Sequence, residues 1–450
     1  GFGNNWNSHL IHACFMNVLG SLCIYYFLKK IELNKRYSLI YTLSFATLCY
    51  PVTGTPFAYL HAYIFSLTAI LVLIIGMLSK KNNYWFVLPI ICFFSFLSMQ
   101  TPSAYIIILI IFFSAYYFIK EKNIENLKYF LFSGILCVAS FFLFLFLTNT
   151  PILNFIYQYI LFPITIGEGR ISGNESAFLS LTEQLNLRRL FGDFKFIHFF
   201  LIPLLLILLH NWKKNTQNFN IVNILIILSV GIFLFNQLIT ANQIYIFSLI
   251  PLLAAILHLN ILRLKISPKF IYVILFIVLF ATIKFHIRYN IDRKFHDIET
   301  INKNKAIPAK IIHNNLNNLM WLTKTAQKPE DEIKTIKKAI EIIDGDNRQK
   351  SLITHYQFIS TILNKDLNIW NRWYLFNDNT HPTENHKYFE IYKELINNNI
   401  KKNNIQVVYL LGHENEILFN DIKNYFTDVC FKSKTLEKDK FSVHEIIDCK

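Results

Sequence analysis

The segment from residue 148 to residue 196 carries charged side chains suited to phosphate chemistry. Glu168 and Arg170 lie two residues apart near its middle, and Arg188 and Arg189 are adjacent near its end. Guanidinium groups hold phosphate through charge-assisted, bidentate hydrogen bonds and stabilise it as a leaving group. We therefore predict that these arginines can bind a phosphate or diphosphate head group. The alternative is a solvated loop whose arginines contact anionic lipid.

A second set of polar side chains gathers near one end of the apolar segments. Polar groups at membrane depth are costly and usually line a cavity. Helix capping or lipid head groups explain each one singly, but the set together predicts an outward-facing polar cavity. His9 and His12 lie one turn apart, so an interfacial pair and a metal pair both remain open. The set comprises His9, His12, His61, Gln100, Thr101, Asn236, Gln237, Asn242 and Gln243.

Motifs of soluble enzymes are absent from the sequence, which has no P-loop, GxGxxG, GxSxG, HExxH or CxxC. Asp344-Gly345-Asp346 matches the DxD pattern that holds a metal ion and a sugar nucleotide in some glycosyltransferases. An Asp-Gly pair after a helix is, however, ordinary turn chemistry. We therefore interpret this motif as a turn, and His381 and His413 as loop residues.

The seven cysteines fall into two groups. Five lie in apolar segments, where cysteine commonly serves as a small apolar residue. Cys430 and Cys449 instead flank eighteen residues near the end of the chain. In an oxidising compartment a disulfide between them would contribute on the order of 3 kcal/mol in the chain-entropy model. The alternative is two free thiols at a frayed terminus.

The overall composition indicates a membrane protein with a water-soluble appendage. Of the 450 residues, 53% are hydrophobic and only 16% are charged, which is more apolar than a soluble core requires. The formal net charge of +15 would suit nucleic acid, but most lysines and arginines up to Lys269 form short clusters between apolar runs. Topology signals have that arrangement, so nucleic acid is not expected as a partner.

Apolar runs predict about ten membrane-spanning helices. The hydrocarbon core of a bilayer is about 30 Å thick, which about 20 helical residues cross, and shorter runs can be tilted or broken. The runs are Ser8–Leu28, Tyr37–Pro51, Pro56–Leu78, Trp85–Met99, Ser103–Ile119, Leu127–Leu147, Ile197–His210, Phe219–Ile239, Gln243–Leu262 and Phe270–Phe285.

Basic clusters predict the orientation of these helices, because lysine and arginine mark cytoplasmic connections. The clusters occupy five alternate connections, so residues 148–196, the amino terminus and everything after His286 are predicted to be external. An external start without a signal peptide is unusual, so we also expect a further helix and loop upstream of Gly1. The clusters lie at residues 29–36, 80–81, 120–128, 213–214 and 263–269.

Two domains are therefore predicted, in the inner (plasma) membrane. Residues 1–286 form a multi-spanning membrane domain with the long external loop 148–196, and residues 287–450 form a small α/β domain on the periplasmic or lumenal side. Alternating helix and strand patterns favour a mostly parallel sheet, with Phe441–Ile447 as its closing edge strand. The other predicted elements are helices Pro329–Ile343, Glu384–Asn403 and Glu416–Phe426, and strands Ser351–His355 and Gln406–Leu411.

The stretch from about Asn5 to Phe118 resembles the membrane core of GT-C glycosyltransferases, a superfamily that includes protein O-mannosyltransferases and aminoarabinose transferases. The resemblance rests on the amide-rich GNNWNSHL before the first helix and on the proline-rich turn and histidine of PVTGTPFAYLHAY. A third stretch, FLSMQTPSAYIIIL, is similar to a recurrent Phe-Leu-x-Lys-Gln-Pro hairpin. The long loop and the external α/β domain also fit that layout.

The resemblance implies transfer of a sugar from a polyprenyl-phosphate donor to an external lipid-linked or cell-envelope acceptor. The sugar would pass through an oxocarbenium-like state while a carboxylate accepts the proton of the acceptor hydroxyl. Arg170, Arg188 and Arg189 are then candidates to hold the departing phosphate. His61 and Gln100 are candidates to line the donor or acceptor cavity.

The catalytic base implied by the resemblance is expected upstream of Gly1. The superfamily carries an Asp or Glu, often the base, in a loop between its first and second helices, and this sequence has no such loop. Glu168 is the best carboxylate within the chain, and Met99 stands where many relatives have lysine. The sequence assigns no cofactor, and a divalent metal ion remains open.

Other classes of protein remain open. An O-antigen polymerase or ligase also has many helices and an arginine-containing external loop, but it usually lacks a large terminal α/β domain. A transporter would show internal repeats and ionisable residues at helix centres, neither of which is clear in this sequence. A non-catalytic receptor would use the external domain for binding, so exchanging that domain alone would transfer its specificity.

Overall fold

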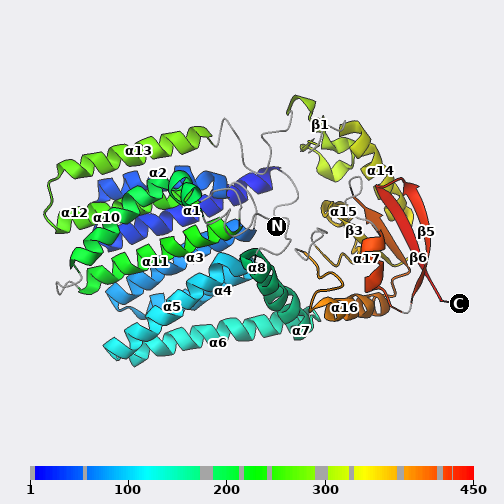
Figure 1. Ribbon diagram of the computed structural model, residues 1–450, viewed down its shortest axis with the longest axis horizontal. Helices are drawn as coiled ribbons and strands as arrows, with labels where there is room; N and C mark the ends of the chain where they lie inside the picture. Colours follow the sequence, from blue (N-terminus) through cyan, green and yellow to red (C-terminus); the bar gives the residue numbers. More distant parts are fainter. Residues whose placement is uncertain are drawn as a thin grey trace. The chain divides into compact units, whose positions relative to one another are not determined.

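Two compact units make up the chain in the computed structural model (Figure 1). The helical unit comprises His9–Ile152 and Leu179–Glu299, and the sheet unit comprises Gly1–Ser8, Leu153–Phe178 and Thr300–Lys450. The structure describes residues 6–53, 58–172, 186–211, 217–240, 246–288, 303–323, 329–371, 380–412, 419–427 and 429–449.

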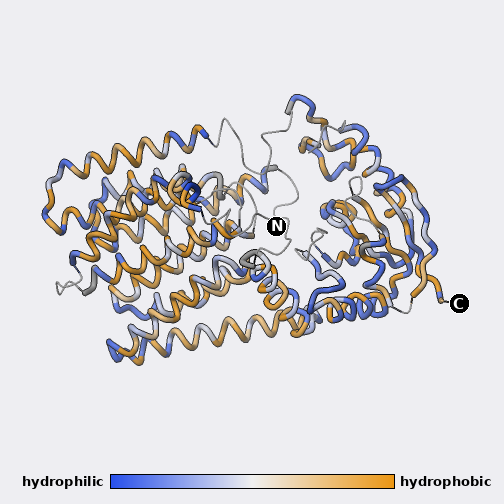
Figure 2. The backbone as a smooth tube through the Cα atoms, viewed as in Figure 1, coloured by the Kyte–Doolittle hydropathy of each residue, from blue (hydrophilic) through white to orange (hydrophobic). Residues whose placement is uncertain are grey.

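The helical unit consists of long apolar helices, and each of the ten predicted runs lies wholly or largely within one of them. Figure 2 shows that hydrophobic residues dominate these helices along most of their length. The helices are α1 (Trp6–Lys30), α2 (Lys35–Thr53), α3 (Ala58–Ser79), α4 (Asn82–Ser98), α5 (Gln100–Glu121), α6 (Ile124–Leu147), α10 (Lys195–Asn211), α11 (Gln217–Thr240), α12 (Leu249–Arg263) and α13 (Lys269–Ile287), with the short η2 (Arg188–Asp193) and η3 (Ile246–Ser248).

Within the described residues, seven helices are long and apolar enough to cross a membrane. Helices α4 and α10 are apolar but have only 17 residues each, and α2 is not among the seven. The chain is therefore a helical protein with the features of a membrane protein, and the predicted count of about ten spans is not confirmed. The seven are α1, α3, α5, α6, α11, α12 and α13.

Helix α12 forms the centre of the helical unit, whereas α6 lies at its surface. In α12, 89% of the most apolar window is buried, compared with 17% in α6, whose exposed residues are mostly leucine, phenylalanine and isoleucine. Interhelical hydrogen bonds hold α12 in place. The hydroxyl of Tyr41 lies 3.0 Å from Nδ1 of His258, and the side-chain amides of Asn223 and Asn260 form two hydrogen bonds with each other. The apolar outer surface of α6 suits contact with lipid.

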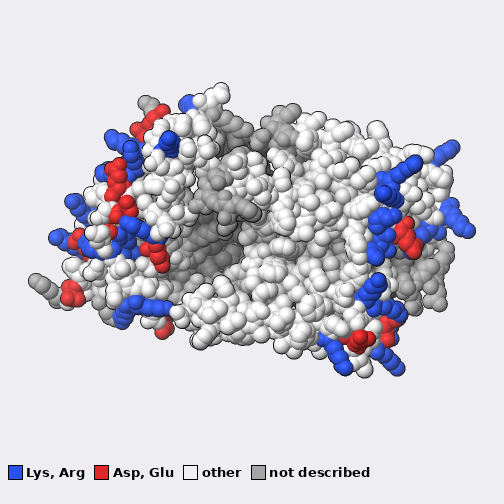
Figure 3. All heavy atoms as spheres, turned by 180° about the vertical axis from the view of Figure 1, so that it is seen from behind, with Lys and Arg blue, Asp and Glu red and all other residues white. Residues whose placement is uncertain are grey.

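Charged side chains gather at one end of the helical unit (right-hand side of Figure 3). Nζ of Lys80, after the last turn of α3, lies 2.6 Å from Oε2 of Glu121 at the end of α5. Asn82 donates to Glu125 at 2.8 Å, linking the starts of α4 and α6. The local sequence sets these helix ends, because Lys122 adopts a left-handed conformation after α5 and the Asn123 side chain caps α6.

The sheet unit contains a four-stranded sheet with helices on both faces. Its principal elements are α7 (Ile152–Phe155), η1 (Ile156–Leu161), α8 (Phe162–Ser172), α14 (Pro329–Gly345), β3 (Lys350–Thr354), α15 (Phe358–Leu363), α16 (Phe389–Lys402), β4 (Val407–Leu411), α17 (Phe419–Ile422), β5 (Cys430–Glu437) and β6 (Phe441–Ile447). Shorter elements are η6 (Lys303–Lys305), β1 (Ile307–Pro308), η7 (Ala309–Ile311), η8 (Asn314–Leu316), β2 (Met320–Trp321) and η9 (Lys423–Tyr425).

The order of the strands, β3-β4-β6-β5, corrects two predictions. Only β3 and β4 are parallel, so the sheet is not mostly parallel. Strand β6 lies inside the sheet, and the unpredicted β5 forms its edge. A short turn joins β5 to β6 and forces them to be antiparallel, and β5 was missed because an edge strand, here CFKSKTLE, can be largely polar.

Strand β4 is buried on both faces, as its continuous apolar run predicts. All five of its residues are buried, with Tyr409 facing the core beneath α14 and Val408 and Leu410 facing the core beneath α16. Helices α14 and α16 therefore cover opposite faces. Of the predicted helix over 416–426, residues 416–418 lie outside the described part, which comprises the α-helical turn α17 and the 3-10 turn η9.

Candidate functional site

A cavity of about 90 Å³ lies within the sheet unit, between the helix at residues 152–172 and the segment containing α16. Four aromatic side chains and three polar side chains line it together with aliphatic residues. The aromatic residues are Tyr157, Phe162, Tyr388 and Tyr392, and the polar residues are Gln158, Asn371 and Thr380. We call this cavity the aromatic pocket.

One wall of the aromatic pocket comes from Pro151–Ile164. This short, aromatic and apolar run is bounded by prolines, so its sequence predicts a helix that lies in the membrane interface. In the structure α7, η1 and α8 follow one another from Ile152 to Ser172, and the middle element η1 is a π-helix. It carries Tyr157 and Gln158 into the pocket. Single π-helical turns are rare and frequently occur at functional sites. In the structure almost all of this segment belongs to the sheet unit, whereas the sequence predicted it to be part of a loop of the membrane domain.

His386 connects this helix to the opposite wall. Its Nδ1 accepts a hydrogen bond from the backbone amide of Tyr388 at 3.1 Å, so in the neutral ring Nε2 carries the proton. Nε2 can then donate to Oγ1 of Thr165, 2.9 Å away, and Thr165 donates to the carbonyl of Phe162 at 2.6 Å. The imidazole also meets the Phe162 ring edge-on, with centroids 5.3 Å apart. This chain of contacts fixes two pocket rings.

The inner wall of the pocket rests on Tyr425 of η9. The rings of Tyr392 and Phe389 contact its ring, with centroids 5.1 and 5.2 Å away, and its hydroxyl donates to the carbonyl of Pro382. Asn397 donates to the carbonyl of Tyr425 at 2.8 Å. Tyr425 is buried, so this wall belongs to the core and its geometry is fixed before any ligand binds.

Glu168 lies on α8, near the aromatic pocket. Its Oε2 is 3.5 Å from Nζ of Lys387, and both side chains are more than half exposed, at 63% and 57%. Such an exposed pair contributes little stability. Arg170 lies two residues further along α8, and its side chain is outside the described residues. Glu168 thus contacts Lys387, which lies between His386 and Tyr388 in the sequence, but Glu168 does not line the pocket.

The other two predicted arginines belong to the helical unit. Arg188 and Arg189 begin η2, a second π-helical turn, and Arg188 is exposed. Nε of Arg189 is 3.9 Å from Oδ2 of Asp193, and its Nη1 is buried without a hydrogen-bond partner among the described residues. A buried guanidinium nitrogen without a partner is costly, which is compatible with an anion reaching it.

His61 also belongs to the helical unit, where it faces His12. Their Nε2 atoms are 3.0 Å apart, so the pair can share a proton in one hydrogen bond. His9 does not complete a metal site with this pair, since no cluster of three or more His, Cys, Asp or Glu residues suited to a metal ion occurs in the described part of the chain. A resident metal ion therefore has no ligand set there.

Gln100 begins α5, next to a tightly packed turn. Ser103 directly follows the cis Thr101–Pro102 bond and is buried. It receives a hydrogen bond from Ser95 of α4 at 2.8 Å, and the hydroxyl of Ser66 of α3 lies 2.8 Å from that of Ser95. These serines hold three helices together below Gln100. The polar segment between two apolar runs is thus explained in part by packing of the helix ends.

Two amides of the predicted polar set are buried in the helical unit. Asn236 donates to the hydroxyl of Tyr59 at 2.8 Å, and that hydroxyl lies 3.1 Å from Oγ1 of Thr240. Gln237 is also fully buried. Asn236 therefore serves at least to join α11 to α3. Asn242 and Gln243 lie outside the described residues.

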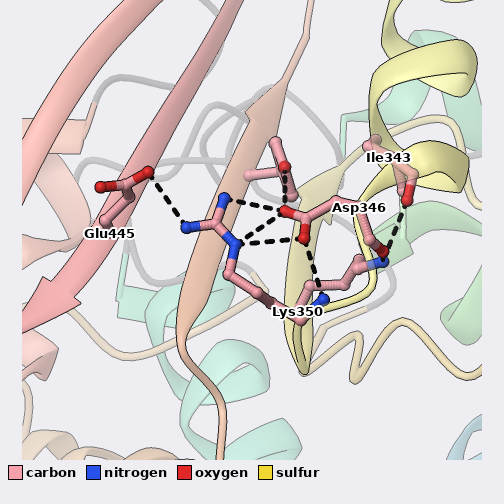
Figure 4. Close-up of polar contacts among 6 residues, drawn as sticks. Ile343, Asp346, Lys350 and Glu445 are labelled. Atoms are coloured by element: carbon pink, nitrogen blue, oxygen red, sulfur yellow. Dashed lines mark hydrogen bonds and ion pairs between the residues drawn. The ribbon is translucent and has the colours of Figure 1, made fainter.

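Each carboxylate of the Asp344-Gly345-Asp346 motif pairs with a cationic side chain, and Figure 4 shows the contacts of Asp346. Asp344 pairs with Lys365 at 2.5 Å, and Asp346 accepts hydrogen bonds from the guanidinium of Arg348 and, at 2.6 Å, from the hydroxyl of Tyr409. Burial alone would raise the pKa of Asp346, but these hydrogen bonds outweigh it and hold that pKa well below its ordinary value. This arrangement agrees with the turn interpretation and leaves little room for a metal ion.

Cys430 and Cys449 form a disulfide with the sulfur atoms 2.14 Å apart. It joins the first residue of β5 to the segment after β6, across the edge of the sheet. Five free cysteines, Cys14, Cys23, Cys49, Cys92 and Cys137, lie in helices of the helical unit. This distribution matches the two groups recognised in the sequence.

The sequence analysis missed the residues that line the aromatic pocket. Tyr388 and Tyr392 lie four residues apart and so share one side of the start of α16, but the same spacing occurs in ordinary core helices. Asn371 and Thr380 flank a stretch without a recognisable pattern. The available signal was the aromatic run in PILNFIYQYILFPI, which the sequence assigned to the membrane interface instead.

Comparison with known protein families, curated proteins and solved structures gives no match to this chain.

The aromatic pocket is suited to recognising a small, partly polar ring. Aromatic faces pack against the C–H face of a sugar, and amide and hydroxyl side chains hydrogen-bond to its hydroxyl groups. Gln158, Asn371 and Thr380 supply such polar groups beside the tyrosine rings. A volume of about 90 Å³ accommodates part of one monosaccharide rather than an oligosaccharide.

Proposed function

We propose that this protein is an integral-membrane glycosyltransferase that moves a sugar from a polyprenyl-phosphate donor to an external lipid-linked or cell-envelope acceptor. The observation that carries the proposal is the aromatic pocket, in which tyrosine and phenylalanine rings lie beside amide and hydroxyl side chains. It occurs in a chain whose described residues include seven helices suited to a membrane, which a lipid-linked substrate requires. The likeness of residues 5–118 to the GT-C core supports the same reaction class.

In this proposal the pocket binds one sugar of the acceptor or the donor. The rings of Tyr157 and Tyr388, whose centroids are 5.8 Å apart at 60°, offer two faces to the sugar. Gln158 and Asn371 would orient its hydroxyl groups. Binding that fixes the acceptor converts a bimolecular reaction into one between held groups, which is the main contribution a pocket of this kind makes to catalysis.

The departing phosphate would need cations, and the arginines predicted for this role are retained in the proposal. Arg189 has a buried nitrogen without a partner among the described residues, so it is the strongest of the three. Glu168 is exposed and paired with Lys387, so the proposal does not depend on it as the base. The sheet unit would face the periplasm or lumen, where envelope acceptors occur.

Sugar transfer by the purified full-length protein in detergent micelles tests the proposal. A panel of polyprenyl-phosphate sugars would be offered with lipid-linked glycan acceptors, and transfer would be followed by mass spectrometry of the products. We expect at least one pair to react. Tyr388→Ala should lower kcat/KM about tenfold or more, because it removes a pocket ring.

The matched control is Tyr272→Ala, since Tyr272 lies on α13 and is 68% exposed, outside the pocket. It should leave transfer unchanged. Equal loss in both variants would mean that the pocket does not bind the sugar. Absence of transfer with every donor, together with sugar binding that Tyr388→Ala abolishes, would replace the enzyme with a receptor of the same specificity.

A further inference from the structure

Two lysines of the helical unit meet where the beginning of α10 packs against the end of α13. Lys195 is the first residue of α10, and its Nζ lies 5.9 Å from the centroid of the Phe196 ring. Lys284 lies in the last turn of α13, and its Nζ is 5.3 Å from the centroid of the same ring. Both lysines are exposed. We call Lys195 and Lys284 the lysine pair.

The core of the helical unit holds the ring beneath the lysine pair in place. Phe196 packs against Phe285 with the ring centroids 5.7 Å apart, and Phe285 stacks on Phe247 of η3 with the centroids 3.7 Å apart. Phe285 and Phe247 are only 3% and 2% exposed. Packing therefore fixes the backbone positions next to both lysines, so a ligand would not have to assemble them.

The positive charges around the lysine pair repel one another. The side chain of Lys284 lies within hydrogen-bonding reach of that of Lys195, and Arg288 adds a second repulsion. Two ammonium groups are both donors, so they do not satisfy each other. Within the described residues, none of these three cations pairs with a carboxylate. Asp193, two residues before Lys195, lies 3.9 Å from Nε of Arg189 instead.

The helix ends account for only part of this charge. The end of α13 carries partial negative charge, which favours Lys284 and Arg288. Lys195 lies in the first turn of α10, where the partial charge is positive and disfavours a cation. An anion between the two lysines would replace their repulsion with two attractions.

Exposed apolar rings next to the lysine pair indicate a lipid as the source of that anion. Phe199 lies four residues after Lys195 on α10. Phe280 lies four residues before Lys284 on α13, so each ring shares one side of its helix with the lysine. The two rings are 48% and 52% exposed. In a bilayer the end of the span Lys269–Ile287 lies at the depth of the lipid head groups, and the rings lie deeper.

We propose that the lysine pair binds the phosphate group of an anionic membrane lipid. The two ammonium groups hold the phosphate between them, and Arg288 adds a longer-range attraction. The apolar chains of the lipid run along the rings of Phe199 and Phe280. All of these groups belong to the helical unit, so the site does not depend on the aromatic pocket or on the proposed sugar transfer.

Lipid binding to the purified full-length protein, without sugar donor or acceptor, tests this proposal. The protein in dodecylmaltoside micelles would be titrated with phosphatidylglycerol or with phosphatidylcholine, whose choline balances its phosphate charge. Bound lipid would be counted by native mass spectrometry. Phosphatidylglycerol should bind about tenfold more tightly, and Lys195→Gln and Lys284→Gln should each remove most of that preference. Equal binding of the two lipids by the wild type would overturn the proposal.

Lys269→Gln is the matched control, because it removes the same charge from the other end of α13, about 22 Å away at 1.5 Å per residue. It should leave the affinity for phosphatidylglycerol within about twofold, since charges at that distance are screened. Equal losses in Lys284→Gln and Lys269→Gln would mean that the lipid responds to the total charge of the protein, which contradicts a site at the lysine pair.

Thermal unfolding separates lipid binding from stability of the fold. In lipid-free micelles Lys195→Gln should unfold at the same temperature as the wild type or at a higher one, because it removes one of two repelling charges. Phosphatidylglycerol should raise the unfolding temperature of the wild type more than that of Lys195→Gln. A variant that unfolds below the wild type without lipid would show that Lys195 stabilises the fold directly, against the proposal.

Glycerol 3-phosphate distinguishes the two sources of the same chemistry, since it carries the phosphate without the apolar chains. At about 10 mM it should not displace phosphatidylglycerol, because it makes no contact with the exposed rings. Displacement at that concentration, lost in Lys195→Gln, would identify a site for a soluble phosphate in place of a lipid site.

Discussion

Two groups of polar side chains in the sheet unit differ in what their hydrogen bonds are used for. Around Asp346, the carboxylate, the guanidinium of Arg348 and the hydroxyl of Tyr409 bind one another, and Arg348 reaches Glu445 at 3.0 Å (Figure 4). In the aromatic pocket, polar side chains line an open volume beside aromatic rings. The first group consists mainly of charged residues, and none of the described residues that line the second is charged.

The difference shows that the charged residues of a motif can be fully used within the fold. Asp346 and Arg348 sit between α14 and the sheet, and they hold the turn of the DxD motif against β4 and β6. Their charges are satisfied internally, so they stabilise the fold. A binding site requires groups whose geometry is fixed by the core but whose hydrogen-bonding capacity remains for a ligand.

Replacing Asp346 should produce the largest effect on stability. Asp346→Asn leaves Arg348 and Tyr409 without their carboxylate partner in a partly buried position, so we expect the β3–β4 region to lose about 2–3 kcal/mol. Hydrogen–deuterium exchange of the full-length protein would measure this as faster exchange of β4 amides. Glu445→Gln is the control and should cost less than about 1 kcal/mol, because both partners of that ion pair are about 40% exposed.

If the network around Asp346 were instead open to a ligand, Asp346→Asn would leave β4 exchange unchanged and would abolish binding or transfer. That outcome would make the DxD motif part of the functional site, and the Asp346 network could no longer be described as purely structural.

Acid should weaken the same network. The folded-state pKa of Asp346 is lowered, because hydrogen bonds from Arg348 and Tyr409 outweigh the opposing effect of burial. Its stabilising contribution is therefore fully present above the unfolded pKa of about 4 and is lost as pH falls from there towards the folded pKa. We expect β4 protection to fall by up to about 2 kcal/mol between pH 5 and pH 2.

In Asp346→Asn this part of the acid dependence should disappear, while protection elsewhere in the sheet unit continues to change. None of the described residues that line the aromatic pocket is charged, so exchange in the helix 152–172 should show a weaker acid dependence. If β4 protection falls with pH equally in the wild type and in Asp346→Asn, another titrating group causes the acid dependence.

A smaller effect is expected where the two walls of the aromatic pocket meet. Thr165→Val removes the oxygen that lies 2.9 Å from Nε2 of His386, which should cost about 1 kcal/mol and loosen helix 152–172. Sugar affinity of the full-length protein should fall about threefold to fivefold. Thr165→Ser restores the hydroxyl and should restore affinity, whereas failure of serine to rescue would assign the loss to packing.

The smallest effect on stability is expected at Glu168. Glu168→Gln removes an exposed pair with Lys387 and should change stability by less than about 0.5 kcal/mol. We also expect transfer activity to remain within about threefold, which agrees with a base located elsewhere. A thousandfold fall in kcat with unchanged KM would instead identify Glu168 as the catalytic base, the role predicted for it within this chain.

Parts of the fold could be predicted because local patterns report burial. Helix α14 was predicted as Pro329–Ile343 and spans Pro329–Gly345, and strand β4 was predicted within one residue of Val407–Leu411. In α14 the apolar residues recur along one side, and in β4 a continuous apolar run is buried on both faces. The apolar runs of the helical unit gave the helices themselves, although not a confirmed number of spans.

The candidate site was harder to predict, because its residues come from separate segments. His386 meets Thr165 across 221 positions of sequence, and Tyr157 meets Tyr388 across a similar interval. The local sequence around either residue of such a contact does not predict its distant partner. The charged residues that did attract attention, at Asp344 and Asp346, proved to be paired within the fold.

The sequence by itself determined the long helices, the strands β3, β4 and β6, and the apolar character of the helical unit, because those properties depend on the periodicity and hydropathy of neighbouring residues. Only the tertiary structure decided that β6 lies inside the sheet, that helix 152–172 packs in the sheet unit, and which polar groups remain available for a ligand. These outcomes depend on long-range pairing, such as Arg348 with Glu445 across 97 positions, and no local pattern encodes such a partner.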